Sequence, residues 1–366
     1  MKSAFKKIGM LTAFVFAFLP VSAYDFTVDG IYYNVVSLSD LTCEVAKGDE
    51  EYAGDITIPE KVTYKNKELT VTSIGNYAFE YCSGLTSITM GNSVTSIGNY
   101  AFENCSALSS ITIGSSVTSI GLRAFENCSV LSSITIGSSV TRIGNCAFLG
   151  CSGLKKVIIE DGIEPLSLGY NSYSYYEDGE GLFYDCPLTT LYLGRDISVN
   201  ENVSGNSRNY GYSPFRGKYN LTEVTIGNSV TRIGYSVFRD CGGLTSITIP
   251  NSVKSIGEYV FSGCSSLASI YSLNPIPPTI GGSNFTNKQY MDMKVYVPQG
   301  SLSAYQSADR WKDFWELQEF DPTGVETIKA DGKNIKDSYY DIQGRKLNAP
   351  KKGLNIINGK KVLIKE

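Results

Sequence analysis

The residues best suited to chemistry gather between Glu164 and Tyr219, where the sequence departs from the repeats that fill most of the chain. This segment holds three neighbouring acids, Glu177, Asp178 and Glu180. Two carboxylates can hydrolyse a glycosidic bond when they flank a cleft at a fixed separation. Three acids within one short polar loop are a poor match to that requirement, so we do not interpret them as a catalytic pair.

The same segment is rich in tyrosine. It contains Tyr170, Tyr173, Tyr175, Tyr176, Tyr184, Tyr192, Tyr210, Tyr212 and Tyr219. Tyrosine offers a large, rigid, half-polar contact surface at low entropic cost, and insertions in repeat proteins often lie on the binding face. We therefore predict a ligand-binding site formed by Tyr170, Tyr173, Tyr175, Tyr176, Glu177, Asp178, Glu180, Tyr210 and Tyr212.

Within this site, Tyr175 and Tyr176 would form one wall, and Tyr210 and Tyr212 the opposite wall. One alternative is that the insertion has no selected function. Another is that its tyrosines only cover irregular parts of the fold.

The composition argues against most catalytic machinery. The chain has 366 residues and no histidine, so it lacks an imidazole base, a Ser-His-Asp or Cys-His nucleophile system and any His-ligated zinc or haem. It shows no nucleophile elbow and no P-loop. The net charge of −4 argues against nucleic acid as the main partner. We expect a non-enzymatic protein without catalytic residues, metal or cofactor.

The N-terminus has the pattern of a signal peptide. Lys2, Lys6 and Lys7 precede an uncharged stretch from Ile8 to Leu19, and Val21-Ser22-Ala23 supplies the small residues of a cleavage site. The apolar stretch would span about 18 Å as a helix, short of the roughly 30 Å hydrocarbon core. We predict cleavage after Ala23 and export to the cell surface or medium, without a transmembrane segment.

Internal repeats indicate the fold. Copies that begin at Val71, Val94, Val117 and Val140, and again at Val230 and Val253, have a period of about 23 residues, within the leucine-rich-repeat range. Each copy has three apolar clusters, V-x-x-I-G, A-F-x-x-C and L-x-x-I-x-I. The last predicts a strand and the second a helical turn. The glycine of the first cluster predicts a corner with positive φ.

Phenylalanine marks the register of the repeats. The marker residues are Phe79, Phe102, Phe125, Phe148, Phe183, Phe215, Phe238 and Phe261. On both sides of Phe183 the spacing between markers is wider than the regular period, which indicates insertions beside two degenerate coils. We therefore predict a stack of about eight coils, in which each buried Phe contributes roughly 1.5–3 kcal/mol by leaving water.

Cysteine recurs three residues after the marker Phe in seven coils, at Cys82, Cys105, Cys128, Cys151, Cys186, Cys241 and Cys264. Parallel stacked side chains hold their Cβ atoms farther apart than a disulfide prefers, and metal ligands must converge on a point. We interpret the series as a buried ladder of thiols. Cys146 falls in an outward column and is predicted to be an exposed thiol. Neither Cys146 nor Cys43 has an identifiable partner.

The strands carry two outward columns of hydroxyls. One contains Thr89, Thr112, Thr135, Thr225 and Thr248, and the other Ser87, Ser110, Ser133, Ser246 and Ser269. Such a surface could recognise glycan hydroxyls or ice. The simpler interpretation is that threonine suits strands and keeps a long sheet soluble.

The pattern V-T-S-I-G-x-x-A-F-x-x-C-S-x-L-T-S-I-T-I resembles the BspA-like leucine-rich-repeat family of exported surface proteins from host-associated bacteria. The resemblance implies a β-rich α+β solenoid over residues 71–272, with the Tyr-rich insert at 164–219. Residues 24–70 resemble the family's N-terminal β cap, and residues 295–317, within a C-terminal cap of 273–321, resemble its closing cap. There, Leu302, Tyr305, Ala308 and Trp311 recur every third residue, which predicts a helix with one apolar face.

Residues 322–366 form a basic tail, with nine Lys and one Arg against five acids. Runs at 340–345, 352–357 and 361–365 predict three short strands. The tail resembles the secretion-sorting tails of exported bacterial proteins, which implies attachment to the cell surface. The alternative is a small hairpin appended to the cap.

The function implied by the resemblance is adhesin-like recognition of an extracellular protein or glycoconjugate, through the solenoid and its Tyr-rich insert. An architectural protein of the envelope without a specific ligand is the second interpretation. An enzyme of unknown type is the least favoured.

Overall fold

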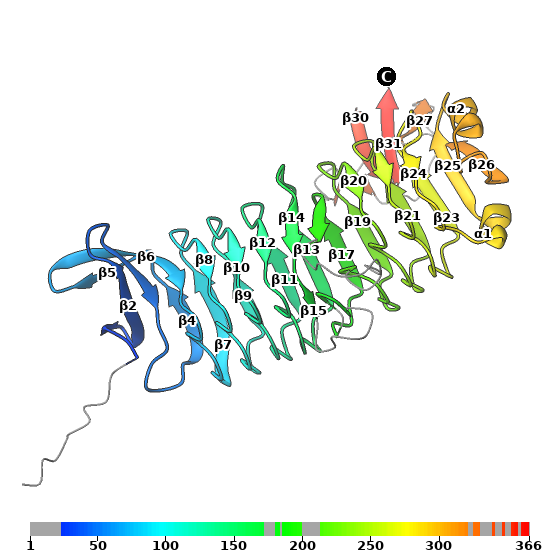
Figure 1. The fold of residues 1–366 in the computed structure, drawn as a ribbon. Coiled ribbons are helices and arrows are strands. Elements are labelled where there is room, and N and C mark those ends of the chain that lie inside the picture. Colours follow the sequence, from blue (N-terminus) through cyan, green and yellow to red (C-terminus); the bar gives the residue numbers. More distant parts are fainter. Residues whose placement is uncertain are drawn as a thin grey trace, which may run out of the picture.

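The computed structural model describes residues 23–171, 180–183, 185–199 and 213–320, together with the segments 325–329, 339–340, 346–347, 353–357 and 360–365. Residues 1–22, which hold most of the expected leader, lie outside this range. The described part of the chain forms the predicted repeat solenoid, in which successive coils contribute strands to two stacks of parallel strands (Figure 1).

The first face of the solenoid is built by the L-x-x-I-x-I clusters. Its strands run parallel in three successive sheets. The first sheet contains β4 (Ala53–Ile58), β7 (Gly84–Met90) and β9 (Ser110–Thr112). The second contains β11 (Ser133–Ile136), β13 (Lys156–Ile159), β17 (Thr190–Leu193) and β19 (Glu223–Ile226). The third contains β21 (Ser246–Ile249), β23 (Ser269–Ser272), β25 (Lys294–Pro298) and β26 (Glu316–Phe320).

The second face is built by the V-x-x-I clusters. Its strands are β6 (Lys67–Ile74), β8 (Ser96–Ile97), β10 (Ser119–Ile120), β12 (Arg142–Ile143), β14 (Leu166–Leu168) and β18 (Ile197–Val199), followed by a separate sheet of β20 (Arg232–Ile233), β22 (Ser255–Ile256) and β24 (Thr279–Ile280). At the N-terminal end, β1 (Phe26–Val28), β2 (Ile31–Ser37), β3 (Thr42–Val45) and β5 (Lys61–Tyr64) extend this face, with antiparallel pairing of β1 to β2, β2 to β3 and β5 to β6.

The A-F-x-x-C clusters form the third side of each coil. The prediction of a helical turn there is wrong, because the residues form a series of tight turns. The amides of Ala78, Glu80 and Cys82 close turns within their own coil. The amides that alternate with them donate instead to the next coil, for example from Phe79 to the carbonyl of Ala101, 2.8 Å away. An α-helix would direct every amide along its own axis, so this alternation gives the turns a ladder of bonds between coils.

The reason given for the repeated glycine is also wrong. None of Gly75, Gly98, Gly121, Gly144, Gly234 and Gly257 has positive φ. A Cβ on Gly121 would lie 2.5 Å from the carbonyl carbon of Gly98. The coils can therefore pack this closely only because glycine has no side chain. The left-handed conformation occurs two residues later, at Tyr77, Tyr100, Arg123, Cys146, Ser236 and Tyr259.

The marker phenylalanines form one continuous stack in the core. Ring centroids of successive members lie between 5.0 and 6.2 Å apart from Phe79 to Phe261, and all eight side chains are fully buried. The predicted register is therefore confirmed through the irregular region, including Phe183 and Phe215. Phe285 continues the stack beyond Phe261, with a centroid distance of 5.8 Å.

The cysteine column is buried beside this stack. The Cys105 thiol donates a hydrogen bond to the carbonyl of Phe79 in the preceding coil, and the same bond recurs at Cys128, Cys151, Cys186, Cys241 and Cys264 with Sγ–O distances of 3.0–3.5 Å. All nine cysteines are free thiols. These six thiols therefore each contribute a weak bond across the coil boundary, whereas the Cys82 thiol contacts the carbonyl of Glu80 in its own coil.

Cys146 corrects another expectation, because it is buried, with only 4% of its surface exposed. Its column is exposed in the first repeat, where Tyr77 lies, but Ser236 in the same column is also fully buried. Cys146 and Ser236 belong to the coils on either side of the irregular region. Exposure in this column therefore depends on the neighbouring coil, which a repeat pattern does not encode.

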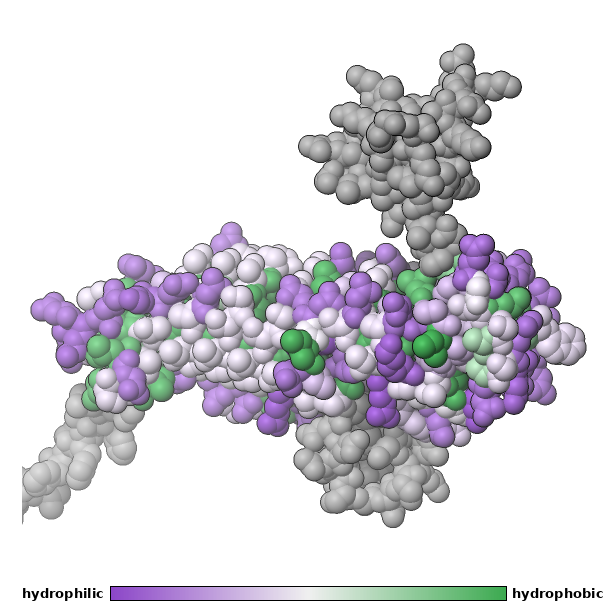
Figure 2. Space-filling model, turned by 90° about the horizontal axis from the view of Figure 1, so that it is seen from above, coloured by the Kyte–Doolittle hydropathy of each residue, from purple (hydrophilic) through white to green (hydrophobic). Residues whose placement is uncertain are grey.

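The hydroxyl columns are interrupted along the first face, although serines pair near both ends, including Ser246 with Ser269. Ser87 pairs with Ser110, and Thr89 with Thr112. From β11 to β13, however, Ser133 faces Lys156 and Thr135 faces Ile158. In the view of Figure 2, hydrophobic residues form small separate patches on a mostly neutral or hydrophilic surface. The hydroxyl surface is therefore too interrupted to form one uniform plane.

Two short helices, α1 (Asn287–Asp292) and α2 (Leu302–Ser307), follow the last coil. The predicted apolar face is present, but the helix ends at Ser307, and Ala308 is extended. Trp311 reaches the same core from a turn. Its ring packs on Tyr305, and its indole N–H donates to the carbonyl of Pro278, 2.7 Å away.

The described segments of the tail form a five-stranded sheet. Its order is β27 (Val325–Lys329), β31 (Lys360–Lys365), β30 (Gly353–Ile357), β28 (Tyr339–Tyr340) and β29 (Lys346–Leu347). Strands at 353–357 and 360–365 match two of the three predicted runs. Of the run at 340–345, only Tyr340 lies in a described strand.

Candidate functional site

The irregular region contains two interruptions, which leave the solenoid at the same corner. The first lies between β14 and Phe183, and the second between β18 and Phe215. Each falls between the second-face strand of a coil and its marker Phe. Because Leu168 pairs with Val199 and the rings of Phe183 and Phe215 stack 5.4 Å apart, the two interruptions occur in adjacent coils. The insert predicted as one segment is thus divided into two stretches of chain, separated by the regular strands β17 and β18.

A short antiparallel hairpin forms the base of the first interruption. Its strands are β15 (Tyr170–Asn171) and β16 (Glu180–Gly181), with Tyr170 opposite Gly181 and Asn171 opposite Glu180. The backbone thus brings Tyr170 and Glu180, two of the predicted site residues, to neighbouring strands. Tyr173, Tyr175, Tyr176, Glu177 and Asp178 lie outside the described residues.

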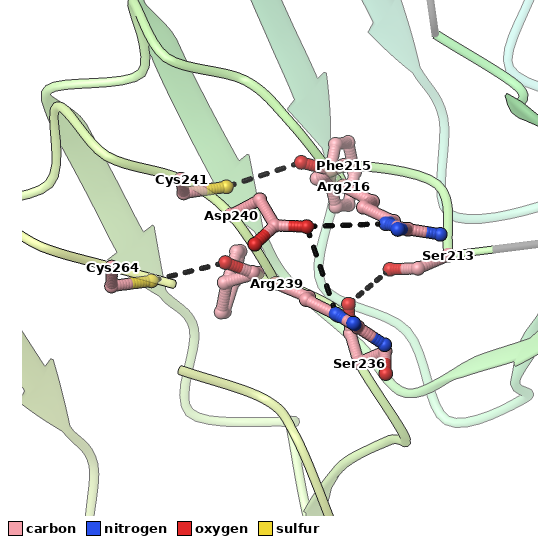
Figure 3. Close-up of polar contacts among 9 residues, drawn as sticks. Ser213, Phe215, Arg216, Ser236, Arg239, Asp240, Cys241 and Cys264 are labelled. Carbon is pink, nitrogen blue, oxygen red and sulfur yellow. Dashed lines mark hydrogen bonds and ion pairs between the residues drawn. The ribbon is translucent and has the colours of Figure 1, made fainter. Parts of the chain in front are cut away.

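The second interruption runs from Val199 to Ser213, and Tyr210 and Tyr212 lie outside the described residues. Its return to the solenoid is held by polar contacts with the next coil (Figure 3). The Ser213 hydroxyl donates to the carbonyl of Ser236. The carboxylate of Asp240 lies 3.3 Å from Arg216 Nε and 3.6 Å from Arg239 Nε. These contacts fix where the chain re-enters the coil.

Two other tyrosines of the segment lie away from this corner. Tyr192 is on β17, on the first face, where its hydroxyl donates to Asp161 Oδ2, 2.6 Å away. That hydrogen bond to a carboxylate raises the pKa of Tyr192. Tyr219 follows the turn after Phe215 and is 70% exposed. Tyr192 and Tyr219 therefore lie on different parts of the coil, away from the predicted site.

Arg195, which the sequence reasoning missed, supports the irregular region from within. It is fully buried, and its guanidinium donates to the carbonyls of Gly137 and Ser138 at 2.6 and 2.7 Å. Burial lowers the pKa of Arg195, opposed by the charge of Glu160. The side chain thereby joins β17 to a coil two positions earlier. Its sequence signal is a positive charge two residues after a strand, where the other coils have Asn, Ser or Asp.

A groove runs along the same corner in the coils before the first interruption. It was not predicted from the sequence. Its volume is about 590 Å³. The lining runs from Asn76 to Gly169, the last residue before the β15–β16 hairpin. It contains the glycines Gly98, Gly121, Gly144 and Gly169, the serines Ser96, Ser119 and Ser167, the asparagines Asn76, Asn99 and Asn145, and Arg142. The groove thus leads to the base of the first interruption.

Asparagine side chains order the wall of this groove. Asn76 Oδ1 accepts the amide of Asn99 at 2.7 Å, and Asn99 Oδ1 accepts the amide of Leu122 at 2.8 Å. The carboxamides are thereby held in a fixed orientation along the stack. The asparagine that follows the repeated glycine was the available sequence signal for this arrangement.

The described residues show no feature of a metal centre. Within them, no three His, Cys, Asp or Glu side chains gather as a group that could hold a metal ion. No helix in the described ranges is long and apolar enough to cross a membrane. The corner instead combines a polar groove with two adjacent loop bases, an arrangement suited to holding a ligand.

Over residues 56–180 and 179–302, the sequence matches the family described as BspA type Leucine rich repeat region (6 copies). The chain belongs to this family. The resemblance expected from the repeat pattern is thereby confirmed for the solenoid of this BspA-type protein. Among curated proteins, no sequence matches the chain.

Several solved structures are similar to this BspA-type chain. A leucine-rich repeat protein from Bacteroides capillosus is 34% identical, covering 32% of this chain and 86% of that one, with a TM-score of 0.30. One from Bacteroides ovatus is 25% identical, covering 81% and 100%, with a TM-score of 0.29. The leucine rich repeat protein of T. pallidum is 20% identical, covering 66% and 90%, with a TM-score of 0.41.

Proposed function

We propose that this BspA-type protein is an exported, non-enzymatic recognition protein that holds an extracellular ligand where the two interruptions leave the solenoid. The observation that carries the proposal is their shared corner. Two excursions from adjacent coils begin at the same position of the repeat, while the Phe stack continues beneath them.

The repetition of the solenoid supports this placement. Many positions of the repeat carry the same residue in successive coils, so repetition alone offers few groups with which to single out one partner. Binding residues concentrate on loops that a rigid scaffold positions. The scaffold here is rigid because the core stack runs through every coil from Phe79 to Phe261, and because strand pairing and turn hydrogen bonds join most neighbouring coils.

The predicted binding residues belong to the two chain segments that interrupt the coils, which supports placing them at this corner. Tyr170 and Glu180 stand at the base of the first interruption. Tyr175 and Tyr176, with Glu177 and Asp178, belong to the segment that this base joins, and Tyr210 and Tyr212 belong to the second. We propose that the two groups supply opposite walls of the site, with tyrosine rings as anchors and carboxylates as acceptors.

An array of glycans and matrix proteins, probed with the mature protein, tests the proposal. Replacing Tyr175, Tyr176, Tyr210 and Tyr212 together by Ala should abolish binding and leave the thermal midpoint nearly unchanged, since such residues contribute to association and little to the core. Tyr219→Ala is the matched control, because this exposed tyrosine comes from the same segment but lies on the turn side. Retained binding together with a large loss of stability would show that the four tyrosines only pack the coils.

Placement at the cell surface is part of the same proposal, and the basic tail is the proposed means of attachment. Deleting residues 322–366 should move the protein from the cell-surface fraction to the medium. An unchanged distribution would remove the tail from the proposal. If the intact protein binds nothing on the arrays yet stays at the surface, the architectural interpretation takes its place.

A further inference from the structure

The groove beside the first interruption presents a similar set of polar groups in successive coils. Ser96 of β8 pairs with Ser119 of β10, and Ser119 pairs with Arg142 of β12. Parallel strands lie roughly 4.8 Å apart, so the groove offers one outward side chain at about that interval along the solenoid axis. A ligand that uses all of them must be a chain lying across the strands.

Several of these groups are available to a ligand. Asn76 and Asn99 each use Oδ1 for a backbone amide, which leaves both Nδ2 groups directed elsewhere. Throughout the described ranges, neither Nδ2 donates a hydrogen bond, and the hydroxyls of Ser96 and Ser119 have no protein partner. The groove therefore presents oriented amide donors beside hydroxyls that can donate or accept.

The backbone of the groove does not favour a peptide ligand. The amides of Gly98, Gly121 and Gly144 already donate to Ile74, Ile97 and Ile120 of the preceding coils. Peptides that add to a sheet depend on free backbone groups at its edge, and none is offered here by these three amides. A peptide in extended conformation also rises about 3.3 Å per residue, which falls out of step with the coils after one or two residues.

A glycan chain fits the same spacing better. The length of one hexose in an extended chain is close to the separation of two coils, and each sugar brings several hydroxyls to hydrogen-bond with amides and serines. The groove has the volume of a small-molecule site, which is roughly 300–1,000 Å³. Among the described residues that line it, the only charged one is Arg142, whose guanidinium suits a carboxylate.

We propose that this groove binds a linear glycan that bears carboxylate groups, laid along the solenoid axis with an acidic sugar at Arg142 and one end at the β15–β16 hairpin. This inference rests on the proposed function, since it names the ligand class for the corner described above. The repeated hydroxyls and amides hold successive sugars, and Arg142 selects the acidic chain over a neutral one.

Calorimetry with the mature protein and four defined probes tests the inference. Three are hexasaccharides that contain uronic acids, from hyaluronan, alginate and polygalacturonate, and the fourth is neutral cellohexaose. At least one acidic probe should bind more tightly than cellohexaose, and its affinity should fall as salt increases. Arg142→Ala should weaken that binding by about tenfold, as expected for losing one hydrogen bond to a charged group.

The chain supplies a matched control. Arg232 occupies the same repeat position on β20, in the sequence Val-Thr-Arg-Ile-Gly that also surrounds Arg142, but it does not line the groove. Arg232→Ala should leave glycan binding unchanged. Both arginines are exposed, so neither substitution should alter folding.

The inference is overturned if none of the three acidic probes binds, or if the two arginine variants weaken binding equally. It is also overturned if the arrays identify a protein ligand whose affinity depends on the four loop tyrosines and not on Arg142; the proposed function then stands. If Arg142→Ala abolishes glycan binding while the loop variant binds normally, the inference stands, and the assignment of recognition to the loops fails.

Discussion

The rings of Phe148 and Phe183 stack with centroids 5.1 Å apart although the chain between them is much longer than one regular repeat. Phe125 and Phe148, which are separated by a single regular repeat, stack at 5.5 Å. The additional chain length lies mostly between β14 and Phe183, and the Phe of the interrupted coil packs like those of its regular neighbours. This continuity supplies rigid support beneath the proposed binding corner.

Phe125→Ala should lower the free energy of unfolding by about 3–5 kcal/mol, because it removes a fully buried ring from the middle of the stack. Chemical denaturation measures the change. Ile163→Ala is the control, since Ile163 is 98% exposed and its substitution should leave the midpoint unchanged. Equal midpoints for Phe125→Ala and the parent protein would contradict the register.

The ladder thiols should resist a thiol reagent in the folded protein and react after unfolding. Burial raises the pKa of Cys82 to about 11 and those of Cys186 and Cys264 to about 12, and the thiolate is the reactive form. Titration of native, unreduced protein near pH 8, followed by titration in denaturant, measures both states. Finding three disulfides among the seven would overturn the ladder.

The same pKa shifts predict loss of stability at high pH. In the unfolded chain the thiols ionise near their ordinary pKa of 9, whereas in the folded protein Cys82 and Cys186 stay protonated to about pH 11 and 12. A raised folded pKa gives stability that is complete below pH 9 and is lost as pH rises toward 12. Each such group should contribute a slope of about 1.4 kcal/mol per pH unit in that window.

The control for this prediction replaces a ladder thiol by a group that does not titrate there. Cys264→Ser keeps a donor for the carbonyl of Phe238 and should reduce the slope between pH 9 and 12. Denaturation midpoints of both proteins at several pH values provide the measurement. Identical slopes would show that other groups dominate alkaline unfolding.

Asp196→Ala should destabilise the junction between the two sheets of the second face. The Asp196 carboxylate accepts the backbone amides of Thr231 and Arg232 at 2.7 and 2.9 Å, where β18 ends one sheet and β20 begins the next. Losing these bonds to a charged acceptor should cost about 1–3 kcal/mol. Asp292→Ala, at an exposed position of α1, should change the denaturation midpoint little.

Expression in the native host should yield a mature chain that begins at Tyr24, because signal peptidase recognises small residues such as those at Val21-Ser22-Ala23. N-terminal sequencing of the secreted or surface protein gives the answer. Ala23→Arg should block processing and leave a longer chain. A mature protein that still begins with the lysines of the leader would contradict the prediction.

The sequence alone determined the features that recur. The repeat period is visible in a single chain, and burial of the same cluster in every coil follows from the need to cover one apolar face with the next. The Phe register, the buried thiol ladder and the parallel strands could all be predicted because each repeat supplies independent evidence for the same position. Phe183 and Phe215 show that this holds even across the interruptions.

The tertiary structure decided what depends on the neighbouring coil. A glycine that recurs at the position of Gly121 suggests a positive φ. In the structure its φ is not positive, and a side chain is excluded because the backbone of Gly98 lies too close. Cys146 and Tyr77 occupy the same column of the repeat, yet Cys146 is buried and Tyr77 is exposed. The difference arises because the coil packed beside each residue is different. The groove beside Arg142 and the shared corner of the two interruptions arise only when coils are stacked, since their parts lie in different repeats and converge through strand pairing.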